Sequence, residues 1–167
     1  MNSPAPPGAA SAVGQAAAAR RFEPVDPAYE ARVRASFGRQ QAMELIGAEM
    51  THVGPGFCEI RLPYRAANTQ QHGFVHGGVV GMIADSAGGY AAYTLFPADA
   101  SILTVEYKLN LVSPAKGGTL VARAEVLKPG RTLTVVRADV VALDGGRETL
   151  CATMQQTLIT LHGKPDR

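Results

Sequence analysis

The sequence predicts an α+β fold in which an antiparallel sheet wraps around one long, central, apolar helix. Two observations lead to this prediction. Residues 77–96 are apolar on nearly every side, so a helix formed by them must be covered by protein or by lipid. Residues 101–160 contain strand-like runs separated by glycine turns, which indicates an antiparallel meander. One twisted sheet around one buried helix satisfies both patterns.

Composition limits the classes of protein that fit. The chain has 167 residues, the size of one domain, and 46% of them are apolar, which suffices for a buried core. A formal net charge of +2 without a Lys/Arg block argues against a nucleic-acid partner. The two cysteines, Cys58 and Cys151, form no metal or disulfide pattern. We therefore expect no cofactor, and a cytoplasmic location fits.

The N-terminal part divides into a tail and the start of the domain. Residues 1–25 are rich in Ala and Pro and are predicted to be a disordered tail, whereas residues 26–163 form the folded domain. Asp26-Pro27 predicts the start of an amphipathic helix that extends to about Ile46. Gly47 can close this helix.

The strands are predicted from period-two alternation and from the turns between them. Residues 48–53 and 57–63 flank a Gly-Pro-Gly turn and form a predicted hairpin, and residues 64–76 are a predicted loop. The alternation is clearest over residues 101–112. Three further strands, separated by glycine-containing turns, are expected over residues 119–128, 131–143 and 147–160.

A membrane-spanning helix is an alternative for residues 77–96. The segment is long enough to span a bilayer, and Gly77-x-x-x-Gly81 resembles a helix-dimer motif. However, Asp85 would lie near the bilayer centre at a cost of about 2.5–3.5 kcal/mol. The strands would also lose the element that covers their apolar faces. We therefore expect no membrane span.

Candidate chemical groups gather at the start of the central helix. His76-Gly77-Gly78 opens the helix, and Asp85 follows nine residues after the histidine. The backbone N–H groups of Gly77 and Gly78 lack intrahelical partners and lie at the positive end of the helix dipole. Such donors can form an oxyanion hole, and glycine lets a carbonyl approach them. A carboxylate on an apolar helix is costly unless it is paired or used, which makes Asp85 the candidate catalytic group.

These motifs resemble a known family. The HGG motif, the acid nine residues after its histidine, and the Ser-Pro-Ala-Lys run at 113–116 are similar to those of hotdog-fold thioesterases of the phenylacetate-pathway type, in the 4-hydroxybenzoyl-CoA thioesterase superfamily. The resemblance covers about residues 40–161. It implies hydrolysis of an acyl-CoA to a free acid and CoA by a homodimer or a dimer-of-dimers tetramer. It implies that the N–H of Gly77 binds the thioester oxygen and that Asp85 acts as nucleophile or general base.

The resemblance points to two further positions. A hydroxyl residue nine positions before the serine of the Ser-Pro-Ala-Lys run falls on Thr104. Many relatives carry Asn six residues before the histidine, where this chain has Gln70, which offers the same amide chemistry on a longer arm. Gln71 could also substitute. Strand alternation places Thr104 on the face opposite its two neighbours. If those neighbours face the helix, Thr104 reaches Asp85 in the same subunit only through a bulge.

Other candidates have simpler interpretations. His76 and Gly78 are expected to lie at the substrate, although the His76 ring could instead hydrogen-bond the backbone and fix the glycine turn. Lys128 and Arg131 lie at turns where they could meet a CoA phosphate, and solvated surface charge is the alternative. His72 and His76 have no third ligand nearby in the sequence, so no metal site is expected.

Two other functions remain open. A hotdog dehydratase or hydratase would need a histidine as acid or base beside the carboxylate. A non-catalytic acyl-CoA-binding protein would be expected to lack the carboxylate or to carry a further DNA-binding module.

The spacing of the two main candidates predicts a shared site. Gly77 and Asp85 are eight residues apart, which is about 12 Å along a helix axis. Two groups that act on one thioester carbonyl must both lie within about 3–3.5 Å of it. We therefore expect two antiparallel copies of the helix to bring Gly77 of one subunit to Asp85 of the other. Small residues that would permit this approach are Gly78, Gly81, Gly88 and Gly89.

Overall fold

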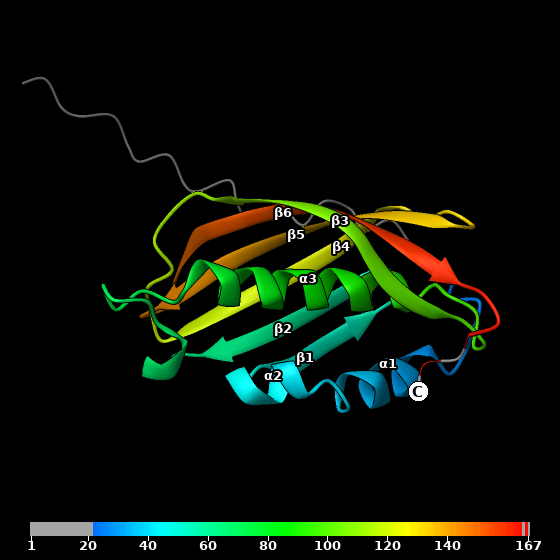
Figure 1. The fold of residues 1–167 in the computed structure, drawn as a ribbon, viewed down its shortest axis with the longest axis horizontal. Helices are drawn as coiled ribbons and strands as arrows, with labels where there is room; N and C mark the ends of the chain where they lie inside the picture. Colours follow the sequence, from blue (N-terminus) through cyan, green and yellow to red (C-terminus); the bar gives the residue numbers. More distant parts are fainter. Residues whose placement is uncertain (1–21, 165, 167) are drawn as a thin grey trace, which may run out of the picture.

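The structure, a computed structural model, describes residues 22–164 and 166 (Figure 1). Most of the predicted tail lies outside the described residues, but Phe22 is included and packs, partly buried, against the core. The elements in chain order are α1 Tyr29–Phe37, α2 Gln41–Ile46, β1 Glu49–Gly54, β2 Phe57–Pro63, the 3-10 turn η2 Ala66–Asn68, α3 Gly77–Tyr93, β3 Ser101–Leu111, β4 Thr119–Lys128, β5 Leu133–Asp144 and β6 Arg147–Leu161.

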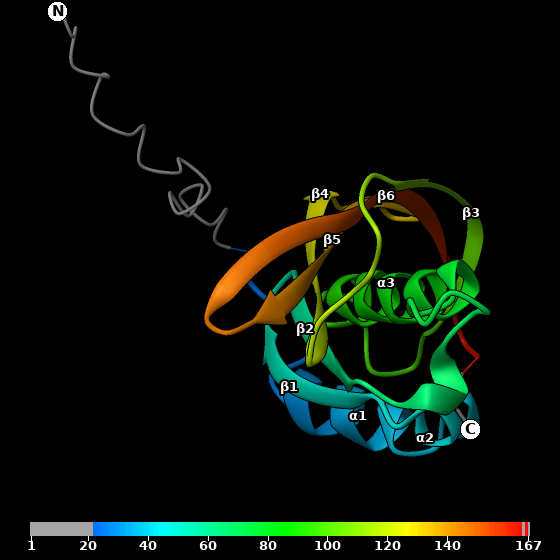
Figure 2. The same cartoon turned by 90° about the vertical axis from the view of Figure 1, so that its left-hand side faces the viewer.

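All six strands form one antiparallel sheet in the order β1-β2-β4-β5-β6-β3. The sheet curves around α3. β1 and β2 lie below the helix in Figure 1, and β3 and β4 lie on opposite sides of it in Figure 2. The predicted arrangement of one antiparallel sheet around a central helix is confirmed, and so is the meander of β4, β5 and β6. The glycine turn before β4 does not make β3 a neighbour of β4. β3 pairs instead with the edge of β6 that faces away from β5.

Helix α3 is buried on most of its surface, as its composition predicts. Ile83, Ala84 and Ala87 are fully buried. From position 80 to the end of the helix, the positions that are not buried are Met82, Asp85 and Gly89. Their spacing of three and four residues places them on one face. Within the described part of the chain, no helix has the length and apolarity that crossing a membrane requires.

Two of the glycines expected to face a partner helix face the sheet of their own chain. A Cβ atom on Gly81 would lie 3.4 Å from the Leu109 side chain, and a Cβ atom on Gly88 would overlap the side-chain amide of Gln156. The expectation is wrong for these positions, because both lie on the part of the helix circumference that the sheet covers. Gly89 remains on the accessible face.

The predicted N-terminal helix is divided in two. The Asp26 carboxylate accepts a hydrogen bond from the backbone two residues on, at 2.9 Å, and Gly47 closes α2 in the left-handed conformation, with φ at 76°. Residues 38–40 interrupt the helix. Arg32 of α1 donates to the Phe96 carbonyl at 2.8 Å, just beyond the C-terminus of α3. α1 packs against α3 and β1, and α2 packs against α3 (Figure 2).

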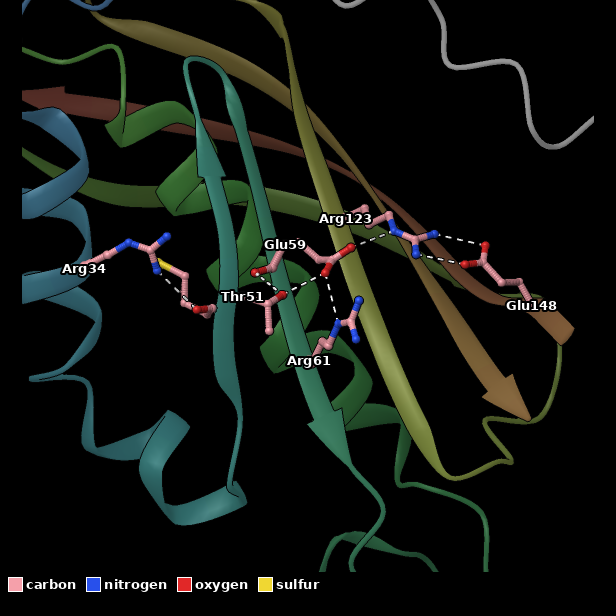
Figure 3. A network of polar contacts seen from close by, with 7 residues as sticks. Arg34, Thr51, Glu59, Arg61, Arg123 and Glu148 are labelled. Carbon is pink, nitrogen blue, oxygen red and sulfur yellow. Dashed lines mark hydrogen bonds and ion pairs between the residues drawn. The ribbon is translucent and has the colours of Figure 1, made fainter. Parts of the chain in front are cut away.

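The outer face of the sheet carries an ion-pair network (Figure 3). Glu59 of β2 accepts hydrogen bonds from Thr51 at 2.7 Å, Arg61 at 3.1 Å and Arg123 at 3.0 Å. Arg123 also donates two bonds to Glu148, at 3.0 and 2.9 Å. The network joins β1, β2, β4 and β6 on the face opposite to α3.

Candidate active site

Asp85 lies on the accessible face of α3 and lines a pocket of about 450 Å³. Its Oδ1 accepts a hydrogen bond from Thr104 Oγ1 of β3 at 2.8 Å. The register of β3 against β6 shifts between Thr104 and Glu106, which makes Val105 the extra residue of a bulge. The bulge lets Thr104 face α3 while Leu109, an odd number of residues further on, also packs against it. Leu103 and Val105 do not face α3, since they are 58% and 56% exposed, so the condition for which the sequence predicted a bulge does not hold.

Gln156 of β6 also contacts Asp85, although it was not among the site residues expected from the sequence. Its Nε2 lies 3.1 Å from Asp85 Oδ1 and 3.3 Å from the Asp85 backbone oxygen. The side chain is only 1% exposed. A sequence signal was present, because Gln156 follows the alternation of the buried residues Met154 and Leu158 and is the polar residue among them.

Polar groups also line the pocket beside Asp85. The Tyr90 hydroxyl lies 3.3 Å from Ser36 Oγ, and Ser86 donates to Gln40 Oε1 at 3.3 Å. These side chains come from α1, α3 and the turn before α2. The pocket therefore offers a ligand both hydrogen-bonding groups and apolar surface.

The first turn of α3 has one free donor rather than two. His76 caps the helix, because its Nδ1 accepts the backbone N–H of Gly78 at 2.9 Å. The prediction that Gly78 offers its N–H to a substrate is therefore wrong, since this hydrogen is already used. The structure instead gives His76 the alternative role of fixing the glycine turn. The N–H of Gly77 has no partner among the described residues.

Gly77 lies in a second pocket of about 360 Å³. Gln70 also lines this pocket, and its side-chain oxygen accepts the backbone N–H of His72. The structure therefore brings Gln70 to Gly77 and Thr104 to Asp85. The two pockets share no lining residue. One chain thus holds its candidate oxyanion donor and its candidate carboxylate in separate places.

The basic candidates lie elsewhere. Lys128 and Arg131 are exposed, next to the turn between β4 and β5, and line neither pocket. Among residues 22–164 and 166, no His, Cys, Asp and Glu side chains gather as metal ligands would.

Comparison with known proteins defines the family. Residues 72–149, which include the HGG motif and Asp85, match the family model described as the thioesterase superfamily. A solved thioesterase family protein from Silicibacter pomeroyi is 49% identical, with a TM-score of 0.80, and the match covers 81% of this chain and 99% of that one. A protein of Saccharolobus solfataricus named "putative esterase" is 32% identical over 68% of this chain and 73% of its own length.

The chain belongs to the thioesterase superfamily and has the hotdog fold. The PaaI protein of the E. coli phenylacetic acid degradation operon shares this fold, with a TM-score of 0.74 at 19% identity over 82% of this chain and 96% of that one. The resemblance seen in the sequence is confirmed at the level of family and fold. Membership in the family makes the chain a hydrolase of thioester bonds in general.

Proposed function

We propose that this hydrolase is an acyl-CoA thioesterase that releases a free acid and CoA, with Asp85 as its catalytic carboxylate. The observation that carries the proposal is the orientation of Asp85. Its Oδ1 accepts two hydrogen bonds, whereas Oδ2 accepts none from the described residues and the carboxylate lines a pocket. A carboxylate held in this way can attack a thioester carbonyl or take a proton from an attacking water.

The oxyanion donor in this proposal comes from a second subunit. The Gly77 N–H has no partner among the described residues, but it lies about 12 Å along the helix from Asp85, in a pocket that shares no residue with that of the carboxylate. A two-fold dimer with antiparallel α3 helices would bring each Gly77 to the partner's Asp85. It would create two equivalent sites, as an isologous interface requires.

The edge strand β3 supports such a dimer. It has a neighbour, β6, on one side only. A long apolar edge strand invites pairing with another chain, and large exposed apolar patches mark interfaces. Five large apolar residues in and just after β3 are 52% to 58% exposed: Leu103, Val105, Tyr107, Leu111 and Val112. A homodimer is the smallest assembly that covers them, and a tetramer would be a pair of such dimers.

The remaining residues take secondary roles in the proposal. Gln70 lies in the pocket of Gly77 and can orient a substrate or a water there through its amide. Lys128 and Arg131 are exposed cations that can meet the phosphates of CoA. The two cysteines are free, which suits a reducing cytoplasm.

Release of free thiol from a panel of acyl-CoAs tests the proposal, with short aliphatic, long aliphatic and aromatic acyl groups. Burial raises the pKa of Cys58 to about 12 and also raises that of Cys151, so both thiols stay protonated and give little background. The key variant is Asp85→Asn, which keeps the shape but can neither attack nor accept a proton. The matched control is Asp99→Asn, because Asp99 is exposed and lines neither pocket.

We expect the wild type to release thiol from at least one substrate and Asp85→Asn to lose about 10³-fold or more in kcat. Saturable binding without turnover would indicate an acyl-CoA-binding protein instead. Hydration of an enoyl-CoA would indicate a hydratase, a function that the capping role of His76 disfavours. Single turnover in heavy-oxygen water separates the two roles of Asp85, since only direct attack labels the aspartate.

A further inference from the structure

The buried amide of Gln156 on β6 has no assigned role in the proposed reaction. It does not line the pocket of Asp85, yet its Nε2 lies 3.1 Å from Asp85 Oδ1 and 3.3 Å from the Asp85 backbone oxygen. Both of these oxygens are hydrogen-bond acceptors, so the NH2 end of the amide must face Asp85. Each of the two amide hydrogens then has an acceptor on Asp85.

The other end of the same amide has no partner in the part of the chain that the structure describes. Gln156 Oε1 is buried and accepts no hydrogen bond from the described residues. A buried carbonyl without a donor destabilises the folded state, and an apolar side chain of similar length would avoid this. A residue that disfavours folding at its position is typical of a group retained for function.

Position 88 of α3 accommodates the amide. Gly88 lies inside the helix, where glycine is less favourable than alanine. A Cβ atom at this position would overlap Gln156 Oε1. Two residues that each disfavour the fold are therefore in contact, and together they bring a hydrogen-bond donor to Asp85.

We propose that Gln156 is a positioning residue for Asp85, an inference that rests on the proposed function. Thr104 and Gln156 together fix Oδ1, so that Oδ2 is the oxygen that attacks the thioester or takes the proton. Without the amide, the carboxylate group can rotate, and Oδ2 spends less time in the reactive orientation. Because Gln156 lies outside the pocket, its loss changes kcat and leaves substrate binding largely as it was.

The test is Gln156→Met, which keeps the length of the side chain and removes both the donor and the unpaired acceptor. The matched control is Gln155→Met, because Gln155 is exposed on the other face of the same strand. In the full chain, with the best substrate of the panel, we expect kcat to fall about 10- to 100-fold. KM should stay within about threefold, and the thermal midpoint should fall by less than about 4 °C or rise.

The outcomes separate this inference from the proposed function. An active wild type with unchanged kcat in Gln156→Met would overturn the inference alone. A large drop in the thermal midpoint, or failure of the variant to fold, would also overturn it, because Gln156 would then be needed for the fold. A wild type without turnover would refute the proposed function and the inference with it.

Discussion

Thr104 donates a hydrogen bond to Asp85 Oδ1 at 2.8 Å because a bulge at Val105 reverses the alternation of β3. Without the extra residue, Thr104 and Leu109 could not both face α3. The edge strand thereby places a hydroxyl group beside the carboxylate and keeps Leu109 packed on the helix further along.

This contact predicts a specific role for the hydroxyl group. Thr104→Val keeps the shape of the side chain and removes the donor, so we expect kcat to fall about 10-fold or more. Thr104→Ser should retain most of the activity, because it keeps the donor. Steady-state thiol release measures both variants. Thr157→Val is the control, since the Thr157 hydroxyl bonds Glu106 instead. Full activity of Thr104→Val would show that the hydrogen bond has no catalytic role.

Gly77→Val should damage catalysis more than folding. The β-branched side chain would block approach to the free N–H, and loss of an oxyanion donor costs about 10²- to 10³-fold in kcat. The new Cβ atom would lie 2.8 Å from Leu111 Cδ1, at the end of a flexible side chain that can move. The control is Gly54→Val, where a Cβ atom meets no atom closer than 4.0 Å. A folded Gly77→Val variant with normal turnover would remove Gly77 from the mechanism.

The adjacent glycines 88 and 89 should differ in their response to alanine. Gly88→Ala forces Cβ against the Gln156 amide and should lower the free energy of unfolding by about 1–3 kcal/mol. Gly89→Ala has room, with Leu158 Cδ2 at 4.0 Å, and should be neutral or stabilising by up to about 1 kcal/mol. Chemical denaturation measures both. The loss at position 88 should shrink in a Gln156→Ala background. Equal effects at the two positions would contradict the close packing of Gly88 against Gln156.

Glu59 should make the stability of the domain sensitive to acid. Burial raises the pKa of Glu59, but hydrogen bonds from Thr51, Arg123 and Arg61 outweigh this effect and hold the pKa below its ordinary value of 4.5. Stability from such a group is complete above the unfolded-state pKa and is lost as the pH falls through the folded-state pKa.

The thermal midpoint should therefore fall less between about pH 6 and pH 3 in Glu59→Gln than in the wild type. Glu44→Gln, which changes an exposed residue of α2, serves as the control. Identical pH profiles for Glu59→Gln and the wild type would show that the network contributes nothing to acid sensitivity.

Local features of the sequence predicted most of the elements. Glycine turns and period-two alternation located the strands to within a few residues, and the apolar run located α3. The sequence did not predict that β3 pairs with β6, because pairing between strands distant in sequence depends on which edge is free in three dimensions. It also did not predict the break in the first helix at residues 38–40.

The candidate site was predictable only where a motif marks it. The HGG motif and Asp85 stand out in an apolar helix, whereas Gln156 lies 71 residues from Asp85 in the chain, and only folding brings the two together. The sequence left His76 two roles, at the substrate or in fixing the glycine turn, and the choice between them depends on a side-chain rotamer. The contact between Gly88 and Gln156 likewise depends on tertiary packing.

Subunit complementation tests whether each active site is built from two subunits. An inactive Asp85→Asn subunit is mixed with an inactive Gly77→Val subunit under conditions of demonstrated subunit exchange. At equal mixing about half of the dimers are mixed, and each regains one of its two sites, so activity should return to about a quarter of the wild-type value. An absence of recovery after complete exchange would contradict a site built from two subunits.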